Sequence, residues 1–143
     1  MFKDILFAVD LPNQESQDKA LQVAITEARA SDATLHVMTV VPDFGLSIVG
    51  SYFPEGFEKK AIDEATQHLH DYVKTKVPAQ VSVQHIVCHG SVYSEILRTA
   101  KEIGCDLIVM ASHRPELQDY LLGPNAARVV RHALCSVLVV RDA

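Results

Sequence analysis

The chain has 143 residues, of which 48% are hydrophobic and 6% aromatic, and it carries a formal net charge of -5. This length and composition suit one compact domain over residues 1–143 with a continuous apolar core. The mild acidity, with no basic cluster longer than Lys59-Lys60, argues against a nucleic-acid partner, because phosphate neutralisation needs a basic stripe.

The sequence also argues against a membrane protein and against a disulfide-rich one. No stretch approaches the roughly 18 to 20 consecutive apolar residues of a membrane span, and Asp4 and Asp10 interrupt the region where a signal peptide would stay apolar. We therefore expect a cytoplasmic protein with no membrane partner. Cys88, Cys105 and Cys135 are odd in number and far apart in sequence, which favours buried, reduced thiols.

Apolar runs typical of strands alternate with amphipathic runs typical of helices. Strands are expected at residues 5–10, 33–41, 81–90, 106–111 and 136–140, and helices at about 14–30, 56–76, 91–103 and 123–133. The run 81–90 alternates polar and apolar residues and suits an edge strand. This order predicts an α/β fold, a doubly wound, Rossmann-like parallel sheet of five strands with helices on both faces.

Ligands of such sheets bind beyond the carboxyl ends of the strands, at the switch point. Asp10 follows the first strand, Val40 ends the second, and the loop after the fourth strand leads to a helix that begins Gly123-Pro124-Asn125-Ala126. A helix N-terminus offers free N–H groups and a partial positive charge to phosphate oxygens. Three loop residues would add hydrogen bonds to the same anion: Ser112, His113 and Arg114.

Purely structural explanations compete with this hypothesis. Proline at the first helical turn sacrifices no needed hydrogen bond, so Gly123-Pro124 can start a helix for steric reasons alone. Asp10 can simply order the turn at Leu11-Pro12. The histidines show no defensible metal-ligand spacing, and neither a nucleophile triad nor a Walker A lysine is present, which disfavours an efficient hydrolase.

Four stretches resemble the universal stress protein family over essentially the whole chain: ILFAVD, HGSVYSEIL, DLIVMASHR and LLGPNAARVVRHALCSVLVVR. The run ASHRP followed by YLLG-x-NAA is similar to small single-domain bacterial members of the F/G type, which bind ATP. The resemblance implies an adenine nucleotide alpha hydrolase-like fold. The family's nucleotide signature, G-x2-G-x9-G-(S/T), reads here Ala111-x2-Arg114-x8-Gly123-Pro124.

The resemblance also implies a set of ligand contacts. Asp10 would lie by the ribose or adenine, the Val40 backbone would read the adenine edge, and Mg²⁺ would be held mainly by phosphate and water. The phosphates would be surrounded by Ser112, Arg114, Gly123 and Asn125. Pro124 departs from the signature and removes one hydroxyl and one backbone donor.

Two functional hypotheses follow, and a redox sensor using Cys88 or Cys135 is disfavoured because neither cysteine has an activating cation beside it in sequence. The first is an ATP-binding stress-response protein in which nucleotide occupancy, rather than rapid turnover, changes which partners dock; at most it would be a slow ATPase. The second is a nucleotide-free interaction module of the same fold. In both, the resemblance predicts a homodimer through residues 136–140, with a tetramer as the larger alternative, because this apolar edge would otherwise template unwanted pairing.

Overall fold

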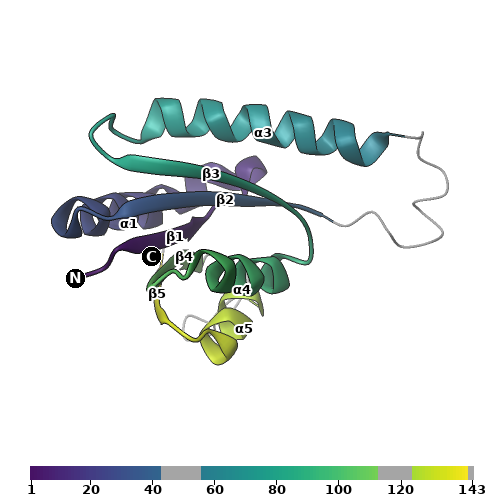
Figure 1. The fold of residues 1–143 in the computed structure, drawn as a ribbon. Coiled ribbons are helices and arrows are strands. Elements are labelled where there is room, and N and C mark those ends of the chain that lie inside the picture. The colour runs from purple at the N-terminus through teal and green to yellow at the C-terminus, as the bar shows by residue number, and fades with distance from the viewer. Residues whose placement is uncertain (43–55, 113–123, 142–143) are drawn as a thin grey trace.

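The computed structural model describes residues 1–42, 56–112 and 124–141. Five parallel strands form one sheet in the order β3-β2-β1-β4-β5 (Figure 1). The strands are β1 (Asp4–Ala8), β2 (Thr34–Pro42), β3 (Ser82–Gly90), β4 (Leu107–Ser112) and β5 (Ser136–Arg141). The predicted doubly wound α/β sheet is therefore confirmed, with β3 and β5 at its edges.

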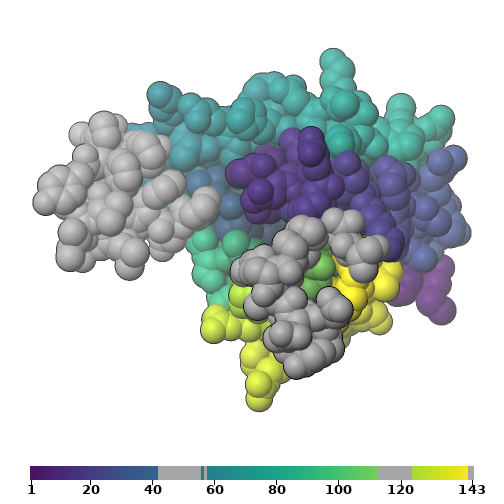
Figure 2. All heavy atoms as spheres, turned by 180° about the vertical axis from the view of Figure 1, so that it is seen from behind, coloured from purple at the N-terminus to yellow at the C-terminus, as the bar shows by residue number. Residues whose placement is uncertain are grey.

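Helices cover both faces of the sheet. They are α1 (Asp18–Ser31), α3 (Phe57–Lys76), α4 (Val92–Ile103) and α5 (Pro124–His132). One apolar cluster joins α1 and α3 to the sheet, and a second joins α4 and α5 to the opposite face. Seen from behind, α1 lies between α3 above it and the C-terminal residues below it (Figure 2). Among the described helices, none has the length and apolar character to cross a bilayer.

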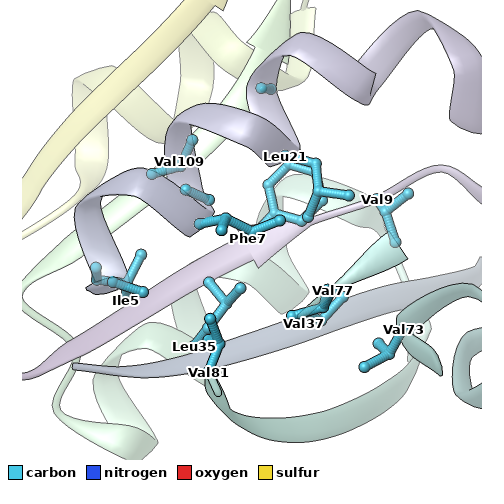
Figure 3. Close-up of a cluster of buried hydrophobic side chains, with 14 of the residues drawn as sticks. Ile5, Phe7, Val9, Leu21, Leu35, Val37, Val73, Val77, Val81 and Val109 are labelled. Atoms are coloured by element: carbon cyan, nitrogen blue, oxygen red, sulfur yellow. The ribbon is translucent and has the colours of Figure 1, made fainter. Parts of the chain in front are cut away.

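The central strand β1 contributes to both clusters, which explains why all its residues after Asp4 are apolar. Ile5 and Phe7 point into the cluster under α1, whereas Leu6 belongs to the cluster under α4 and α5. All three side chains are fully buried. Figure 3 shows Phe7 meeting Leu21 of α1. A strand covered on both faces needs apolar side chains at every position, so it shows no alternation.

The first helical segment differs from its prediction. Residues Leu11–Gln17 form a 3-10 helix, η1, with non-helical backbone angles at Asn13, and the α-helix begins only at Asp18. Pro12 lacks an N–H group, and the Asn13 N–H turns back to the Asp10 carbonyl at 3.0 Å. These local hydrogen bonds replace the first turn of the α-helix that the apolar spacing predicted.

The expectation of buried thiols is confirmed for two of the three cysteines. Cys88 and Cys105 are buried, but Cys135 is only half-buried, and all three are free. The Sγ atoms of Cys105 and Cys135 lie 3.8 Å apart. The pairing of β4 with β5 starts at Leu107 and Ser136, so the fold brings the residues just before these two strands together.

Helix ends follow the sequence signals. Gly104 ends α4 with φ +66°, a left-handed conformation that glycine adopts without a steric penalty. Its neighbour Cys105 donates its N–H to the Ala100 carbonyl at 3.0 Å, which satisfies one of the last helical acceptors. The chain then enters β4 directly. Ser91 precedes α4 as predicted, although its side chain makes no capping hydrogen bond.

Candidate functional site

A cleft of about 580 Å³ opens where β1, β2 and β4 end. The sheet order places β2 and β3 on one side of β1 and β4 and β5 on the other, so the chain reverses its direction of growth between β1 and β4. The cleft lies at this switch point, the usual ligand position of an open α/β sheet. Its volume is within the roughly 300 to 1,000 Å³ of small-molecule sites.

The cleft has an apolar floor and a polar rim. Side chains from three strands and α4 form the floor: Ala8, Met38, Met110 and Ile96. The rim is made by Asp10, Asn13, Ser16, Gln17, Ser112 and Asn125. Among the described lining residues, Asp10 is the only one with a charged side chain. This arrangement suits a flat, partly apolar ligand group with hydroxyls that hydrogen-bond at the edge.

Asp10 is held in position by η1. Its backbone N–H donates to Gln17 Oε1 at 2.7 Å, and the Asn13 side-chain amide donates to Asp10 Oδ2 at 2.9 Å. Gln17 is buried, with 8% of its surface exposed, although it is polar. Sequence reasoning missed both amides, because a glutamine in a polar run before a helix carries no signal of burial. Together they fix the Asp10 backbone and one carboxylate oxygen.

The Val40 backbone faces the cleft because β2 is longer than β1. Strand pairing between β1 and β2 stops at Ala8 and Met38, where the Val9 N–H still donates to the Met38 carbonyl at 2.9 Å. Residues two apart in a strand direct their backbone groups to the same side, so Val40 follows Met38 in facing the β1 side. There β1 has ended, which leaves this backbone edge available to a ligand.

The opposite wall combines the end of β4 with the start of α5. Ala111 and Ser112 end β4, and Pro124, Asn125 and Ala126 form the first turn of α5; all five residues line the cleft. Pro124 has no N–H group, so the backbone donors of this turn begin at Asn125. The first turn contains no acidic residue that would neutralise the helix N-terminus. The wall is therefore able to receive a negatively charged group.

A third wall comes from α4, which places Val92 beside the floor residue Ile96. The acidic residue of its first turn, Glu95, accepts hydrogen bonds from Arg98 at 2.7 and 3.1 Å. Chiefly through this hydrogen bond, Arg98 holds the pKa of Glu95 below its ordinary value. The carboxylate beside this wall thus stays ionised and paired at neutral pH.

The structure brings together seven of the ten residues that the sequence singled out: Asp10, Val40, Ala111, Ser112, Pro124, Asn125 and Ala126. The other three, His113, Arg114 and Gly123, lie outside the described residues. Asn13, Ser16 and Gln17 join the lining without having been predicted. Segments more than a hundred positions apart in sequence thus share one cleft.

Comparison with known proteins assigns the family. Residues 1–141 match the universal stress protein family. The chain belongs to the universal stress protein family. Among curated relatives, universal stress protein G of Escherichia coli O157:H7 is 35% identical over 145 aligned residues, which cover 99% of this chain and 100% of the relative.

Solved structures of other universal stress proteins share the fold. A family member from Burkholderia pseudomallei superposes with a TM-score of 0.73 at 27% identity, covering 96% of this chain and 95% of that one. A universal stress protein in complex with cAMP has a TM-score of 0.63 at 22% identity, covering 99% and 98%. The protein from Archaeoglobus fulgidus in complex with dAMP has a TM-score of 0.61 at 17% identity, covering 96% of each chain.

Among the described residues of this universal stress protein, no histidine lines the cleft. His70 of α3 and His85 of β3 stack with ring centroids 4.0 Å apart, and His36 Nε2 lies 2.9 Å from Asp4 Oδ1 at the amino end of the sheet. In the part of the chain that the structure describes, no three histidine, cysteine or acidic residues cluster as a metal site.

Proposed function

We propose that this universal stress protein binds ATP with Mg²⁺ in the cleft and acts as a nucleotide-dependent regulatory protein of the stress response. The observation that carries the proposal is the composition of the cleft: an apolar floor, an ordered carboxylate at one end and a helix N-terminus at the other. These three parts match the base, the sugar and the phosphates of a nucleotide.

Backbone geometry and two structural neighbours support adenine as the base of the nucleotide. The free edge of β2 at Val40 offers an N–H and a carbonyl, the donor and acceptor pair that an adenine edge complements. Two structural neighbours hold adenine nucleotides, namely cAMP and dAMP. We place adenine over the floor residues Ala8, Met38 and Met110, with its edge against Val40.

The ribose would lie against Asp10. One carboxylate oxygen already accepts the Asn13 amide at 2.9 Å, and the other is directed by the same fixed backbone. An ionised carboxylate accepts hydroxyl hydrogen bonds strongly, so a diol at this position gains charge-assisted contacts. The buried Gln17 contributes by holding the Asp10 backbone rather than by touching the ligand.

The phosphates would lie at the first turn of α5. Asn125 and Ala126 line this end of the cleft in the first turn of α5, where backbone N–H groups have no partner within the helix, and Ser112 adds a hydroxyl. His113, Arg114 and Gly123 are proposed to complete the cradle from the loop outside the described residues. Mg²⁺, when bound, neutralises phosphate charge; in this proposal it is held mainly by phosphate oxygens and water, since Asp10 is the sole described carboxylate of the lining.

Nucleotide occupancy is proposed to act on partner docking in a cytoplasmic homodimer. The edge strand β5 leaves Leu138 37% exposed, and Leu134 just before it is 93% exposed. An exposed edge strand with apolar side chains can pair with the same strand of a second copy, which forms a symmetric dimer. β4 and α5 link this edge to the phosphate end of the cleft. A bound nucleotide would therefore change the structure of the dimer surface through these two elements.

Calorimetric titration of Mg-ATP into nucleotide-stripped protein tests the proposal, with AMP and GTP as comparisons. Micromolar binding that prefers ATP over both comparison nucleotides is the expected result. AMP should bind more weakly because it lacks the phosphates that reach α5, and GTP because its base edge presents the opposite donor and acceptor pattern to Val40. An absence of heat up to millimolar ATP, with an equally silent fluorescent analogue, would contradict the proposal.

The missing N–H of Pro124 favours a second candidate, a nucleotide-free interaction module. If each lost phosphate contact costs about 1.5 to 3 kcal/mol, affinity falls roughly tenfold to a hundredfold unless neighbouring donors compensate. In this case the function would reside in the β5 surface alone. The same titration separates the two candidates.

A further inference from the structure

Two thiols meet at the amino end of the sheet, opposite the cleft. Cys105 lies between α4 and β4, and Cys135 lies between α5 and β5, with their Sγ atoms 3.8 Å apart. Both pack with the cluster under α4 and α5, so they lie on the same face of the sheet. A disulfide requires the sulfur atoms to approach to about 2.05 Å. The remaining distance is within the reach of side-chain rotation and small backbone shifts.

The exposures of the two thiols differ and suggest a division of roles. Cys135 is half-buried, whereas Cys105 is 8% exposed. Burial, reinforced by Cys135 and by the carboxylates of Asp106 and Asp4, raises the pKa of Cys105 to about 12. Thiolates are the reactive form of cysteine, so Cys105 is a poor first nucleophile. The accessible Cys135 is the thiol that meets a small oxidant first.

We propose that Cys105 and Cys135 are a modification site, at which a peroxide oxidises the pair to an intramolecular disulfide. This site is separate from the cleft, and the proposal does not depend on nucleotide binding. The third cysteine, Cys88, is not part of the proposed site. Its Sγ lies 3.4 Å from Thr99 Oγ1 and 3.7 Å from Arg98 Nη2. Cys88 therefore serves as the internal control.

The reaction proceeds in two balanced steps. The Cys135 thiolate attacks one peroxide oxygen, the O–O bond breaks, and the leaving hydroxide takes a proton to become water; Cys135 is now a sulfenic acid. The Cys105 sulfur then attacks the Cys135 sulfur, the S–O bond breaks, and the Cys105 proton leaves with the hydroxide as a second water. Two thiols have lost two electrons, and one hydrogen peroxide has become two waters.

The disulfide would close the chain between residues 105 and 135, a segment that contains β4 and α5. Cross-linking a loop of this size restricts the unfolded chain and raises stability, provided that the folded state is not strained. For a domain of this length the expected rise in Tm is on the order of 10 °C. Reduction with dithiothreitol should reverse it.

The test treats the full-length reduced protein with hydrogen peroxide and compares wild type with Cys88→Ser, Cys105→Ser and Cys135→Ser. Wild type and Cys88→Ser should each lose two titratable thiols, give a Cys105–Cys135 cross-linked peptide by mass spectrometry, and unfold at a higher Tm. Neither of the other variants should show the cross-link or the reversible rise in Tm. If Cys105→Ser fails to fold, Cys105→Ala provides the same test.

Three outcomes would overturn the proposal. One is a cross-link between two chains on a non-reducing gel without an intramolecular peptide. Another is oxidation of Cys135 to sulfinic acid while Cys105 stays reduced. The third is retention of all three thiols at peroxide concentrations that oxidise a small-molecule thiol completely.

Discussion

Asn125→Asp should move nucleotide affinity and protein stability in opposite directions. Asn125 lines the cleft in the first turn of α5, where it is half-buried, and this turn contains no acidic residue. A carboxylate there interacts favourably with the helix N-terminus, which stabilises the folded protein. The same carboxylate occupies the position where the phosphates are proposed to bind, so it repels them.

Both magnitudes follow from electrostatics. At a separation of about 6 Å and an effective dielectric constant of about 20 to 40, two unit charges repel by roughly 1.4 to 2.8 kcal/mol. This repulsion corresponds to Mg-ATP affinity about 10 to 100 times weaker. A carboxylate in the first helical turn contributes about 0.3 to 1 kcal/mol of stability, which raises the Tm of a chain of this length by about 1 to 3 °C.

The assay combines calorimetric titration of Mg-ATP with thermal unfolding of the nucleotide-free protein. Gln80→Glu is the matched control, because it adds the same negative charge at an exposed position between α3 and β3, at the far end of the sheet. Its affinity should remain within twofold of wild type. Unchanged ATP affinity in a folded Asn125→Asp protein would refute the placement of the phosphates at α5.

Three further predictions follow from the described contacts. Gln17→Ala should lower the free energy of unfolding in urea by about 1 to 3 kcal/mol, because the Asp10 N–H loses its acceptor at 2.7 Å, whereas Gln14→Ala should cost less than about 0.5 kcal/mol. Leu138→Asp should shift the mass measured by light scattering from dimer to monomer, and an unchanged mass would contradict pairing through β5. Burial, and to a smaller extent the charge of His70, lowers the pKa of His85 below its ordinary value of 6.5. At acidic pH the unfolded chain therefore binds more protons than the folded protein, so the free energy of unfolding falls as pH drops below about 6.5. His85→Gln should weaken that fall in urea titrations on either side of this pH, and an identical fall in both proteins would show that His85 does not contribute.

The sheet and its order were predictable because each strand carries a local signal. Apart from Asp4 and Ser112 at their ends, the buried strands β1 and β4 are apolar runs, and the alternation in β3 indicated an edge position. Parallel connection of these runs through helices leaves few possible topologies. Because the carboxyl ends of parallel strands share one edge of the sheet, the sequence also predicts that Asp10, Val40 and Ser112 lie at that edge.

The burial of Gln17 and the approach of two cysteines were not predictable from the sequence. The burial of Gln17 depends on the 3-10 turn at Asn13, which the apolar spacing of the following helix concealed. The approach of Cys105 to Cys135 depends on the register of β4 against β5. The first contact depends on a local turn that the apolar spacing does not signal. The second depends on a pairing between two strands, which a single sequence does not specify directly.

The central claim is that Mg-ATP binds at the carboxyl end of the sheet, and backbone amide NMR spectra recorded during a Mg-ATP titration test it most directly. The largest shift changes should fall on Asp10, Val40, Ser112, Asn125 and Ala126, while amides at the opposite end of the sheet, such as Asp106 and Ser136, stay in place. The account would be contradicted if saturating Mg-ATP left the chemical shifts of the cleft amides unchanged, or if it changed only the shifts of amides elsewhere.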